Sequence, residues 1–202
     1  MNFRALYSTL VRHKCFTFSH QDILSFYPSE KKESLKQALF RWRKKGWVQS
    51  LKKGLYELSY PEDLALPDLW IANKLYSPSY VSLETALSYY SVIPEVSMAV
   101  TSVTTKPTRR FKNKHGLFIY RTIHPAGFRG YYVEKYREYD ILIAEPEKAL
   151  ADYLYFKTSR RKKYDFGEER WDKKLIQRLD RKKLVQYASL YRLDLKGFYA
   201  HL

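Results

Sequence analysis

The strongest constraint on the fold lies in residues 30–45, where apolar side chains recur at helical spacing. Leu35, Ala38, Leu39 and Trp42 follow an i, i+3, i+4, i+7 pattern, which places all four on one side of a helix. Such a helix is about 24 Å long. Because its apolar side must be buried against other elements, this segment predicts the centre of a small helical domain.

The residues that flank this helix predict how it begins and ends. Ser29 is a candidate N-cap and Gly46 a candidate C-terminal stop, since these residue types satisfy the unpaired backbone groups at helix ends. Beyond Gly46, apolar runs at 47–51 and 55–58 enclose Lys52-Lys53-Gly54. This arrangement predicts a β-hairpin with a glycine turn and a basic tip.

Two more helices are predicted upstream, over residues 3–12 and 20–26, with a short extended piece at 16–18 between them. Ser19 is the expected N-cap of the second helix. Three helices followed by a basic-tipped hairpin is the order of a winged helix-turn-helix. We therefore expect such a domain over residues 1–60.

Positive charge is concentrated at the two ends of the chain, whose formal net charge is +16. Residues 1–60 carry 12 Lys and Arg against 4 Asp and Glu, residues 61–157 carry 12 against 11, and residues 158–202 carry 13 against 6. Such an excess favours a polyanionic partner, and double-stranded DNA fits the predicted fold best. The alternative is a basic surface that is only solvated.

The predicted third helix and hairpin supply two kinds of candidate DNA contact. Side chains that match base edges are expected to read sequence, and Lys or Arg at other positions to hold phosphates. The predicted base-reading residues are Ser34, Gln37 and Arg41, and the predicted phosphate contacts are Lys36, Lys44, Lys52 and Lys53. Phe40 lies on the outward side, where we favour packing against the next domain over contact with a thymine methyl group.

The basic segment 106–115 is predicted to be a loop between two strands. It contains Arg109 and Arg110, which are assigned as a second phosphate contact, although a solvated hairpin tip is an equal alternative. Residues 160–163 are a similar basic run and are ambiguous in the same way. Because Pro61 and Pro67 enclose a connector without a Gly/Ser stretch, the next domain is expected to follow closely.

Residues 61–202 predict a small mixed α/β domain with basic helices at its C-terminal end. Val, Ile, Thr and aromatic residues favour strands, and caps and apolar spacing favour helices. The strands are expected at 98–105, 117–123, 129–134 and 140–144, and the helices at 69–76, after Ser82, at 145–156, 171–179 and 181–192. The predicted fold class of the whole chain is therefore α+β.

Several classes of chemistry lack support in the sequence. The single cysteine, Cys15, cannot form an intramolecular disulfide, and no apolar stretch approaches the length of a membrane span. The five histidines are scattered, and no phosphate-binding glycine loop occurs. Asp140 and Glu147 are a possible Mg²⁺ pair of a nuclease, but Glu147 suits a helix start. We expect a cytoplasmic protein without metal or cofactor that is not an enzyme.

Three blocks of the second region together carry a family resemblance. The first and longest is Pro78-Ser-Tyr-Val-Ser-Leu-Glu-Thr-Ala-Leu-Ser-Tyr-Tyr-Ser-Val-Ile-Pro-Glu95. The others are Thr101-Ser-Val-Thr-Thr-Lys106 and Ile141-Leu-Ile-Ala-Glu-Pro-Glu-Lys-Ala-Leu150. These blocks resemble the family of AbiEi-type antitoxins, which are predicted transcriptional regulators of phage-defence systems. Taken with the predicted winged helix, the resemblance covers residues 1 to about 157.

The resemblance implies an N-terminal winged helix and a C-terminal domain needed for antitoxicity. It also implies negative autoregulation of an operon shared with a nucleotidyltransferase-like toxin, with which the protein would be functionally paired. The residues themselves leave other functions open: a stand-alone transcription regulator, a protein-binding adaptor or a nuclease subunit. Most apolar residues of the three blocks are expected to be core, and they receive no binding role.

Overall fold

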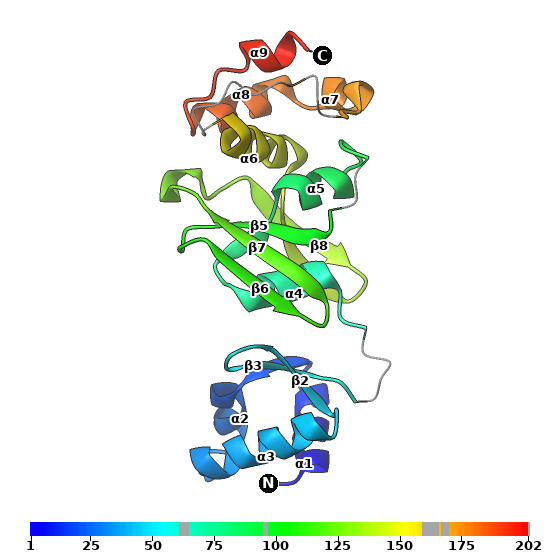
Figure 1. Ribbon diagram of the computed structural model, residues 1–202, viewed down its shortest axis with the longest axis vertical. Helices are drawn as coiled ribbons and strands as arrows, with labels where there is room; N and C mark the ends of the chain where they lie inside the picture. The colour runs from blue at the N-terminus through cyan, green and yellow to red at the C-terminus, as the bar shows by residue number, and fades with distance from the viewer. Residues whose placement is uncertain (61–64, 95–96, 159–165, 167–169, 202) are drawn as a thin grey trace. The chain divides into compact units, whose positions relative to one another are not determined.

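The computed structural model describes residues 1–60, 65–94, 97–158, 166 and 170–201. The chain divides into two compact units. The first comprises Met1–Leu66 and Lys112–His115, and the second comprises Pro67–Phe111 and Gly116–Leu202. The predicted α+β class is confirmed, since both units combine helices with a sheet (Figure 1). Pro61 and the basic run 160–163 lie outside the described residues.

The first unit consists of three helices and a small antiparallel sheet. Its elements are α1 Phe3–Arg12, β1 Thr17–Ser19, α2 His20–Phe26, α3 Lys32–Lys44, β2 Val48–Lys52 and β3 Leu55–Leu58. The strand order is β1-β3-β2. The predicted hairpin of residues 47–58 is confirmed. The predicted extended piece at 16–18 forms β1, which pairs with the edge of β3 opposite β2.

The core of the first unit is built on the side of α3 that the sequence predicts. Leu35, Ala38, Leu39 and Trp42 are all buried and belong to one apolar cluster with residues of α1, α2 and the sheet. Because these four residues face inward, the polar residues between them are turned toward solvent. The packing of this stripe thus decides which side chains α3 presents.

The two predicted serine caps have opposite outcomes. Ser19 caps α2 as expected: its amide donates to the carboxylate of Asp22 at 2.7 Å, and the Asp22 amide donates to Ser19 Oγ at 3.2 Å. Ser29 does not cap α3, which starts later and has Lys31 at its N-cap without a side-chain hydrogen bond. The Glu30 amide instead donates to the carbonyl of Tyr27 at 3.1 Å, so Ser29 lies inside a turn.

The second unit contains a six-stranded mixed sheet. Its strands are β4 Ser79–Val81, β5 Ala99–Thr104, β6 Arg109–Asn113, β7 Gly116–Thr122, β8 Tyr131–Tyr136 and β9 Tyr139–Ala144, in the order β6-β7-β5-β4-β9-β8. Strand β4 is antiparallel to β5 and parallel to β9, and β5 is parallel to β7. The predicted loop 106–115 is wrong in part, because β6 occupies half of it. Strand β4 was also not predicted, because a strand of three residues is too short to show an alternating apolar pattern.

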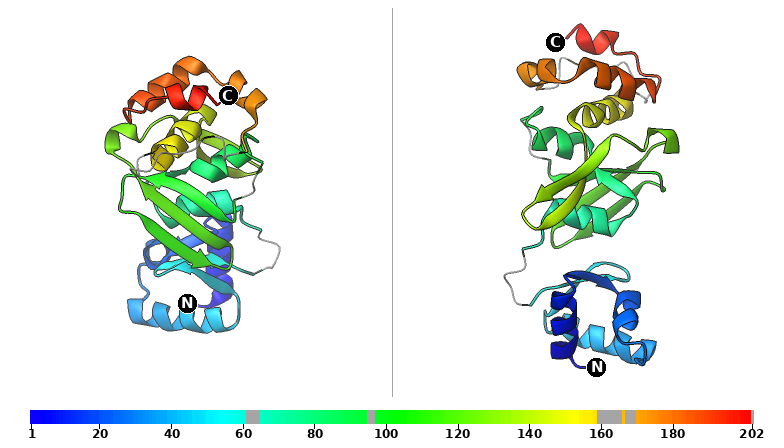
Figure 2. Two further views of the ribbon diagram at one scale, coloured as in Figure 1. Left: turned by 45° about the horizontal axis from the view of Figure 1, so that its top comes forward. Right: turned by 180° about the vertical axis from the view of Figure 1, so that it is seen from behind.

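Helices cover both faces of this sheet. Helix α4, Asp68–Leu75, lies on one face, where Tyr120 of β7 donates to the carbonyl of Ala72 at 2.6 Å. Helices α5, Leu83–Tyr89, and α6, Pro146–Thr158, lie on the other (Figures 1 and 2). The remaining helices are α7 Lys173–Arg178, α8 Arg181–Ser189 and the unpredicted α9 Lys196–Tyr199, with α8 packed on α6.

Candidate functional site

The first candidate site is the solvent-facing side of α3. Ser34, Gln37 and Arg41 are all exposed there. Their i, i+3, i+7 spacing places them along one line of the helix, next to the buried stripe. The structure therefore brings the three predicted base-reading residues together, and their contact with bases stays a prediction.

A second line of exposed residues on α3 runs beside the hairpin. Phe40, Arg43 and Lys44 line a hollow with Val48 and Gln49 of β2. Lys44 Nζ lies 4.8 Å from the centroid of the Phe40 ring, which is itself 56% exposed. An aromatic ring flanked by cations presents both an apolar and a positively charged surface.

Sequence reasoning did not select Arg43, although it stands in the hollow beside β2. The residue lies three positions after Phe40 and seven after Lys36, so helical spacing alone puts all three on the same side. The predicted phosphate contact Lys36 thus belongs to the side that carries Arg43. The other predicted phosphate contact on α3, Lys44, also lines the hollow.

The hairpin between β2 and β3 supplies the remaining predicted contacts of the first unit. Lys53 is exposed and Lys52 is half-buried at the end of β2. Gly54 has a φ of +82°, a conformation that glycine adopts without steric cost. The turn therefore holds two lysines at a tip whose backbone depends on the glycine.

His20, the first residue of α2, is half-buried and lies near two lysines of α3. Burial, together with the charges of Lys36 and Lys32, lowers the pKa of His20 below its usual value. A positive charge at a helix N-terminus is also opposed by the helix dipole. His20 is consequently held in its neutral form beside a positively charged surface.

Arg109 and Arg110 lie in the second unit, whereas the other predicted phosphate contacts belong to the first. Both are exposed at the start of β6. They therefore belong to a strand and not to the loop that was expected. Their contact with phosphate stays a prediction, as does that of the lysines of the first unit.

The second unit contains a buried polar cluster that sequence reasoning missed. Lys148 and Asp152 of α6 are fully buried and form an ion pair. Lys148 Nζ donates to the hydroxyl groups of Tyr80 and Tyr191, both at 2.8 Å. The Asp152 carboxylate accepts from Tyr80 at 3.0 Å, from Ser82 at 2.8 Å and from Tyr191.

Burial governs the protonation of this cluster. It lowers the pKa of Lys148, against the opposing effect of the Asp152 carboxylate. It also raises the pKa values of Tyr80 and Tyr191 far above the usual tyrosine value, with Asp152 adding to the shift. Both phenols therefore stay protonated and can donate. We interpret the cluster as a structural link between β4, α6 and the end of α8.

The cluster escaped prediction because its main pair has an ordinary spacing. Lys148 and Asp152 are four residues apart on α6, a separation that usually marks an exposed pair on a helix surface. Ser82 was predicted to cap α5; it occupies that position, but its hydroxyl group donates to Asp152 instead. One signal was present in the sequence. Ala149, Leu150 and Ala151 separate Lys148 from Asp152, so this part of α6 shows no continuous polar side that would be exposed, and residues 147–154 are all buried.

Within the described residues, no group of three or more His, Cys, Asp and Glu side chains is arranged to hold a metal ion. None of the helices described is long and apolar enough to cross a membrane. Asp140 and Glu147, the possible Mg²⁺ pair, are engaged elsewhere. Asp140 pairs with Lys135 at 3.2 Å, and Glu147 accepts from the Asp180 amide at 3.0 Å.

No protein-family model matches this chain, and no curated protein matches it at a significant level. The three sequence blocks that resemble AbiEi-type antitoxins lie in the second unit. They form β4 with α5, most of β5, and β9 with the start of α6. The buried cluster joins the first and third blocks, because Lys148 of the third donates to the Tyr80 hydroxyl of the first at 2.8 Å.

Proposed function

We propose that the protein is a DNA-binding transcriptional regulator whose first unit is a winged helix-turn-helix. The observation that carries the proposal is the combination of element order and exposed charge in that unit. The order α1-β1-α2-α3-β2-β3, with strands arranged β1-β3-β2, is typical of winged helices. The side of α3 that faces solvent is basic, and so is the tip of the hairpin.

Within this proposal, α3 enters the major groove and the hairpin follows the phosphate backbone. Arg41 and Gln37 have the planar donor groups that match guanine and adenine edges bidentately. Lys52 and Lys53 have flexible ammonium groups, which attract phosphates without reading sequence. Base contacts are thereby assigned to the Ser34, Gln37 and Arg41 line, and phosphate contacts to the lysines.

The first experiment titrates labelled duplexes that contain the upstream region of the protein's own operon or a shuffled sequence, at several salt concentrations. Arg41→Ala should weaken the free energy of binding to the operator by about 1–3 kcal/mol, and it should reduce the ratio of operator affinity to shuffled-duplex affinity. Lys53→Ala should weaken both duplexes equally and flatten the log-log salt slope by about one unit. No preference of the wild type for its own upstream region would exclude autoregulation.

Arg43→Ala is the matched control for Arg41→Ala, because both residues are exposed on α3 and differ in the side that they occupy. Arg43 is expected to act as a phosphate contact, so its removal should weaken both duplexes. If Arg43→Ala loses the preference for the operator and Arg41→Ala keeps it, the residues that contact bases lie on the side of α3 beside β2.

We further propose that the second unit carries an AbiEi-like antitoxin activity against a nucleotidyltransferase-like toxin encoded in the same operon. The support is the resemblance of the three blocks, whose residues contribute β4, most of β5 and most of β9 to the sheet, and α5 and the start of α6 to the helices on one of its faces. Co-expression of the full chain with the toxin should protect cells. Residues 1–60 alone should not, and full protection by that fragment would contradict this division of labour.

An adaptor that binds a protein partner is the second candidate function. It is favoured by one observation, the 56% exposure of Phe40 at the centre of the solvent-facing side of α3, since exposed aromatic residues are frequent in protein interfaces. Phe40→Ala distinguishes the two functions. A DNA-reading helix should lose operator affinity modestly, whereas an adaptor should lose its protein partner and bind DNA without sequence preference.

A further inference from the structure

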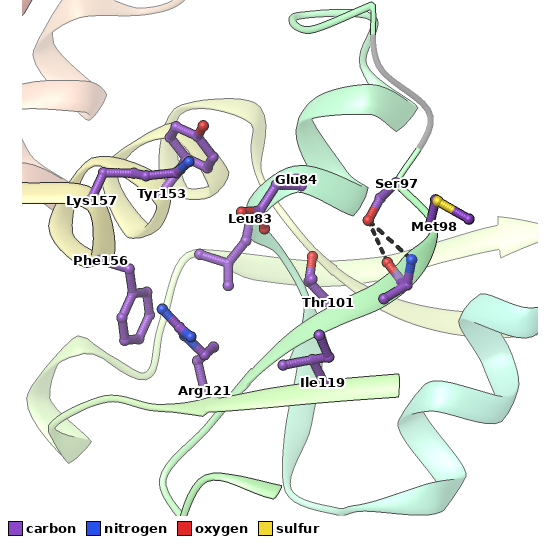
Figure 3. A pocket seen from close by; sticks show the side chains of 11 residues that line it. Leu83, Glu84, Ser97, Met98, Thr101, Ile119, Arg121, Tyr153, Phe156 and Lys157 are labelled. Atoms are coloured by element: carbon purple, nitrogen blue, oxygen red, sulfur yellow. Dashed lines mark hydrogen bonds between the residues drawn. The ribbon is translucent and has the colours of Figure 1, made fainter. Parts of the chain in front are cut away.

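Two features of the second unit have no role in the proposed function: a cavity and an open edge of the sheet. The cavity has a volume of about 340 Å³ and lies on the sheet face that α5 and α6 cover (Figure 3). Arg121 Cζ lies 4.9 Å from the centroid of the Phe156 ring, and Lys157 Nζ lies 4.9 Å from that of Tyr153. Charged groups of the cavity lining thus contact rings of the same lining, whereas the groups of the open edge point outward.

The open edge is the outer side of β8, the last strand in the order β6-β7-β5-β4-β9-β8. Residues 131–136 pair with residues 139–144 of β9 in one unbroken antiparallel register, and β8 has no other strand neighbour among the described residues. Alternate backbone N–H and C=O groups of such a strand point away from its neighbour. The outer side of β8 therefore offers hydrogen bonds to a further strand.

The two edges of the sheet differ in charge. The opposite edge strand, β6, presents Arg109 and Arg110, which are both exposed, and charged side chains are a common protection of sheet edges against pairing. Strand β8 carries one charge of each sign, Glu134 and Lys135, and Lys135 Nζ already lies 3.2 Å from the Asp140 carboxylate. An approaching strand therefore meets no net charge at β8.

The side chains at this edge are those of a protein-binding surface. Tyr132, Val133 and Tyr136 of β8 and Tyr89 of α5 are between 38% and 55% exposed. The hydroxyl groups of Tyr90 and Tyr132 share a hydrogen bond of 3.1 Å, which restrains the Tyr132 ring. Aromatic residues are enriched in protein interfaces, and a side chain that is already restrained loses less entropy on binding.

The strand is complementary to itself. When two identical edges pair antiparallel about a two-fold axis, one residue must face its own copy. With Val133 facing itself, Tyr132 lies opposite the second copy's Glu134. Tyr131 then lies opposite the second copy's Lys135, so no like charges meet. Registers centred on Glu134 or Lys135 would instead place two like charges opposite each other.

From these observations we infer that the outer edge of β8 binds a second copy of this chain, by antiparallel pairing centred on Val133. The pairing would join the two six-stranded sheets into one continuous sheet. It would also bring together two copies of the first unit, as an operator with two half-sites requires, but the pairing itself does not depend on DNA. Because one pair of strands buries a small area, we expect a dissociation constant of about 1–100 µM.

Sedimentation velocity of the full-length protein, over a concentration series that spans this range, measures the association. The wild type should change from monomer to dimer. Val133→Lys places two like charges at the two-fold axis and should raise the dissociation constant roughly tenfold or more. Val185→Lys is the matched control, because Val185 is an exposed valine of α8, and it should associate like the wild type.

Cysteine variants test the register, in a Cys15→Ser background that removes the single native thiol. With oxidised glutathione, Val133→Cys should give a disulfide-linked dimer, because residue 133 faces its own copy. Lys135→Cys should not, since the two copies of residue 135 would be more than about 10 Å apart. This pair decides the inference even if Val133→Lys does not fold. A monomeric wild type at every concentration, a folded Val133→Lys that associates like the wild type, or equal cross-linking of both cysteine variants would each overturn it.

Discussion

Two helices, α3 in the first unit and α6 in the second, treat charged residues in opposite ways. In the first unit the charges of α3 are on the surface, and the core cluster consists of apolar residues. In the second unit a lysine and an aspartate of α6 are completely buried. Charges at a surface are free to meet a partner, whereas buried charges are occupied by one another.

This difference in burial indicates which substitutions should change ligand binding and which should change stability. Removing an exposed cation from α3 takes away a possible ligand contact and leaves the core intact. Removing a member of the buried cluster leaves another charge without its partner in a medium of low dielectric constant. We therefore expect substitutions of exposed α3 residues to change binding and substitutions in the cluster to change folding.

The largest expected effect is that of Lys148→Met. It leaves the Asp152 carboxylate buried without its cation, which should lower the free energy of unfolding of the second unit by about 3–5 kcal/mol. Hydrogen exchange followed by mass spectrometry measures this separately for the two units. Lys174→Met, at an exposed position of α7, is the control and should stay within about 0.5 kcal/mol of the wild type.

A double variant sharpens this result. Lys148→Met with Asp152→Leu removes both charges, so it should be more stable than Lys148→Met alone. If Lys148→Met unfolds no more readily than Lys174→Met, the cluster does not stabilise the second unit. The proposed contrast between substitutions that change folding and substitutions that change binding would then be wrong.

The next effect in size is that of Gly130→Ala, which introduces a side chain where α8 approaches the sheet. Gly130 has a φ of +73°, and a Cβ there would lie 2.7 Å from the ring of Tyr187. We expect a loss of about 1–3 kcal/mol in the second unit. In the background of Tyr187→Ala the clash disappears and only the backbone cost remains, so thermal unfolding of the double variant should show a smaller additional loss.

A smaller effect is expected for Arg41→Ala on folding. The residue is exposed, so the free energy of unfolding of the first unit should change by no more than about 0.5 kcal/mol, while operator affinity falls by about 1–3 kcal/mol. Urea unfolding and DNA titration of the same preparation compare the two quantities. A stability loss as large as the binding loss would show that binding and folding are not separable in the first unit.

The smallest effect concerns pH. The pKa of His20 is lowered in the folded state, so the unfolded chain takes up a proton first as the pH falls below about 6.5. The first unit should therefore lose stability between pH 7.5 and 5.5. His20→Gln should reduce this loss, and His124→Gln, in the second unit, should not. A loss in His20→Gln as steep as in the wild type would exclude His20 as its source.

The elements with long, regular patterns could be predicted from the sequence, and those with short patterns could not. The stripe of Leu35, Ala38, Leu39 and Trp42 predicts α3 and its exposed side, because four apolar residues repeat with the period of a helix and are buried together. The start of α3 was misplaced, since the turn after Tyr27 competes locally with the Ser29 cap. Boundaries of this kind depend on one or two hydrogen bonds and carry a weak signal.

The buried cluster and the cavity could not be predicted because they depend on distant parts of the chain. Tyr80 of β4, Asp152 of α6 and Tyr191, which follows α8, meet in the fold, and no local spacing indicates that meeting. Arg121 and Phe156 likewise come together only when β7 and α6 pack on the same side of the sheet. Such sites require the topology to be known first.

The pairing of β4 with β9 has a consequence for the order in which the chain folds during synthesis. The helices and the hairpin of the first unit end at Leu58, so its core residues leave the ribosome early. Strand β4 follows soon afterwards but must wait for Ile143, its partner in β9, and Tyr80 must wait for Tyr191. Because distant contacts form slowly and late, a growing chain should acquire a folded first unit well before its second unit is complete.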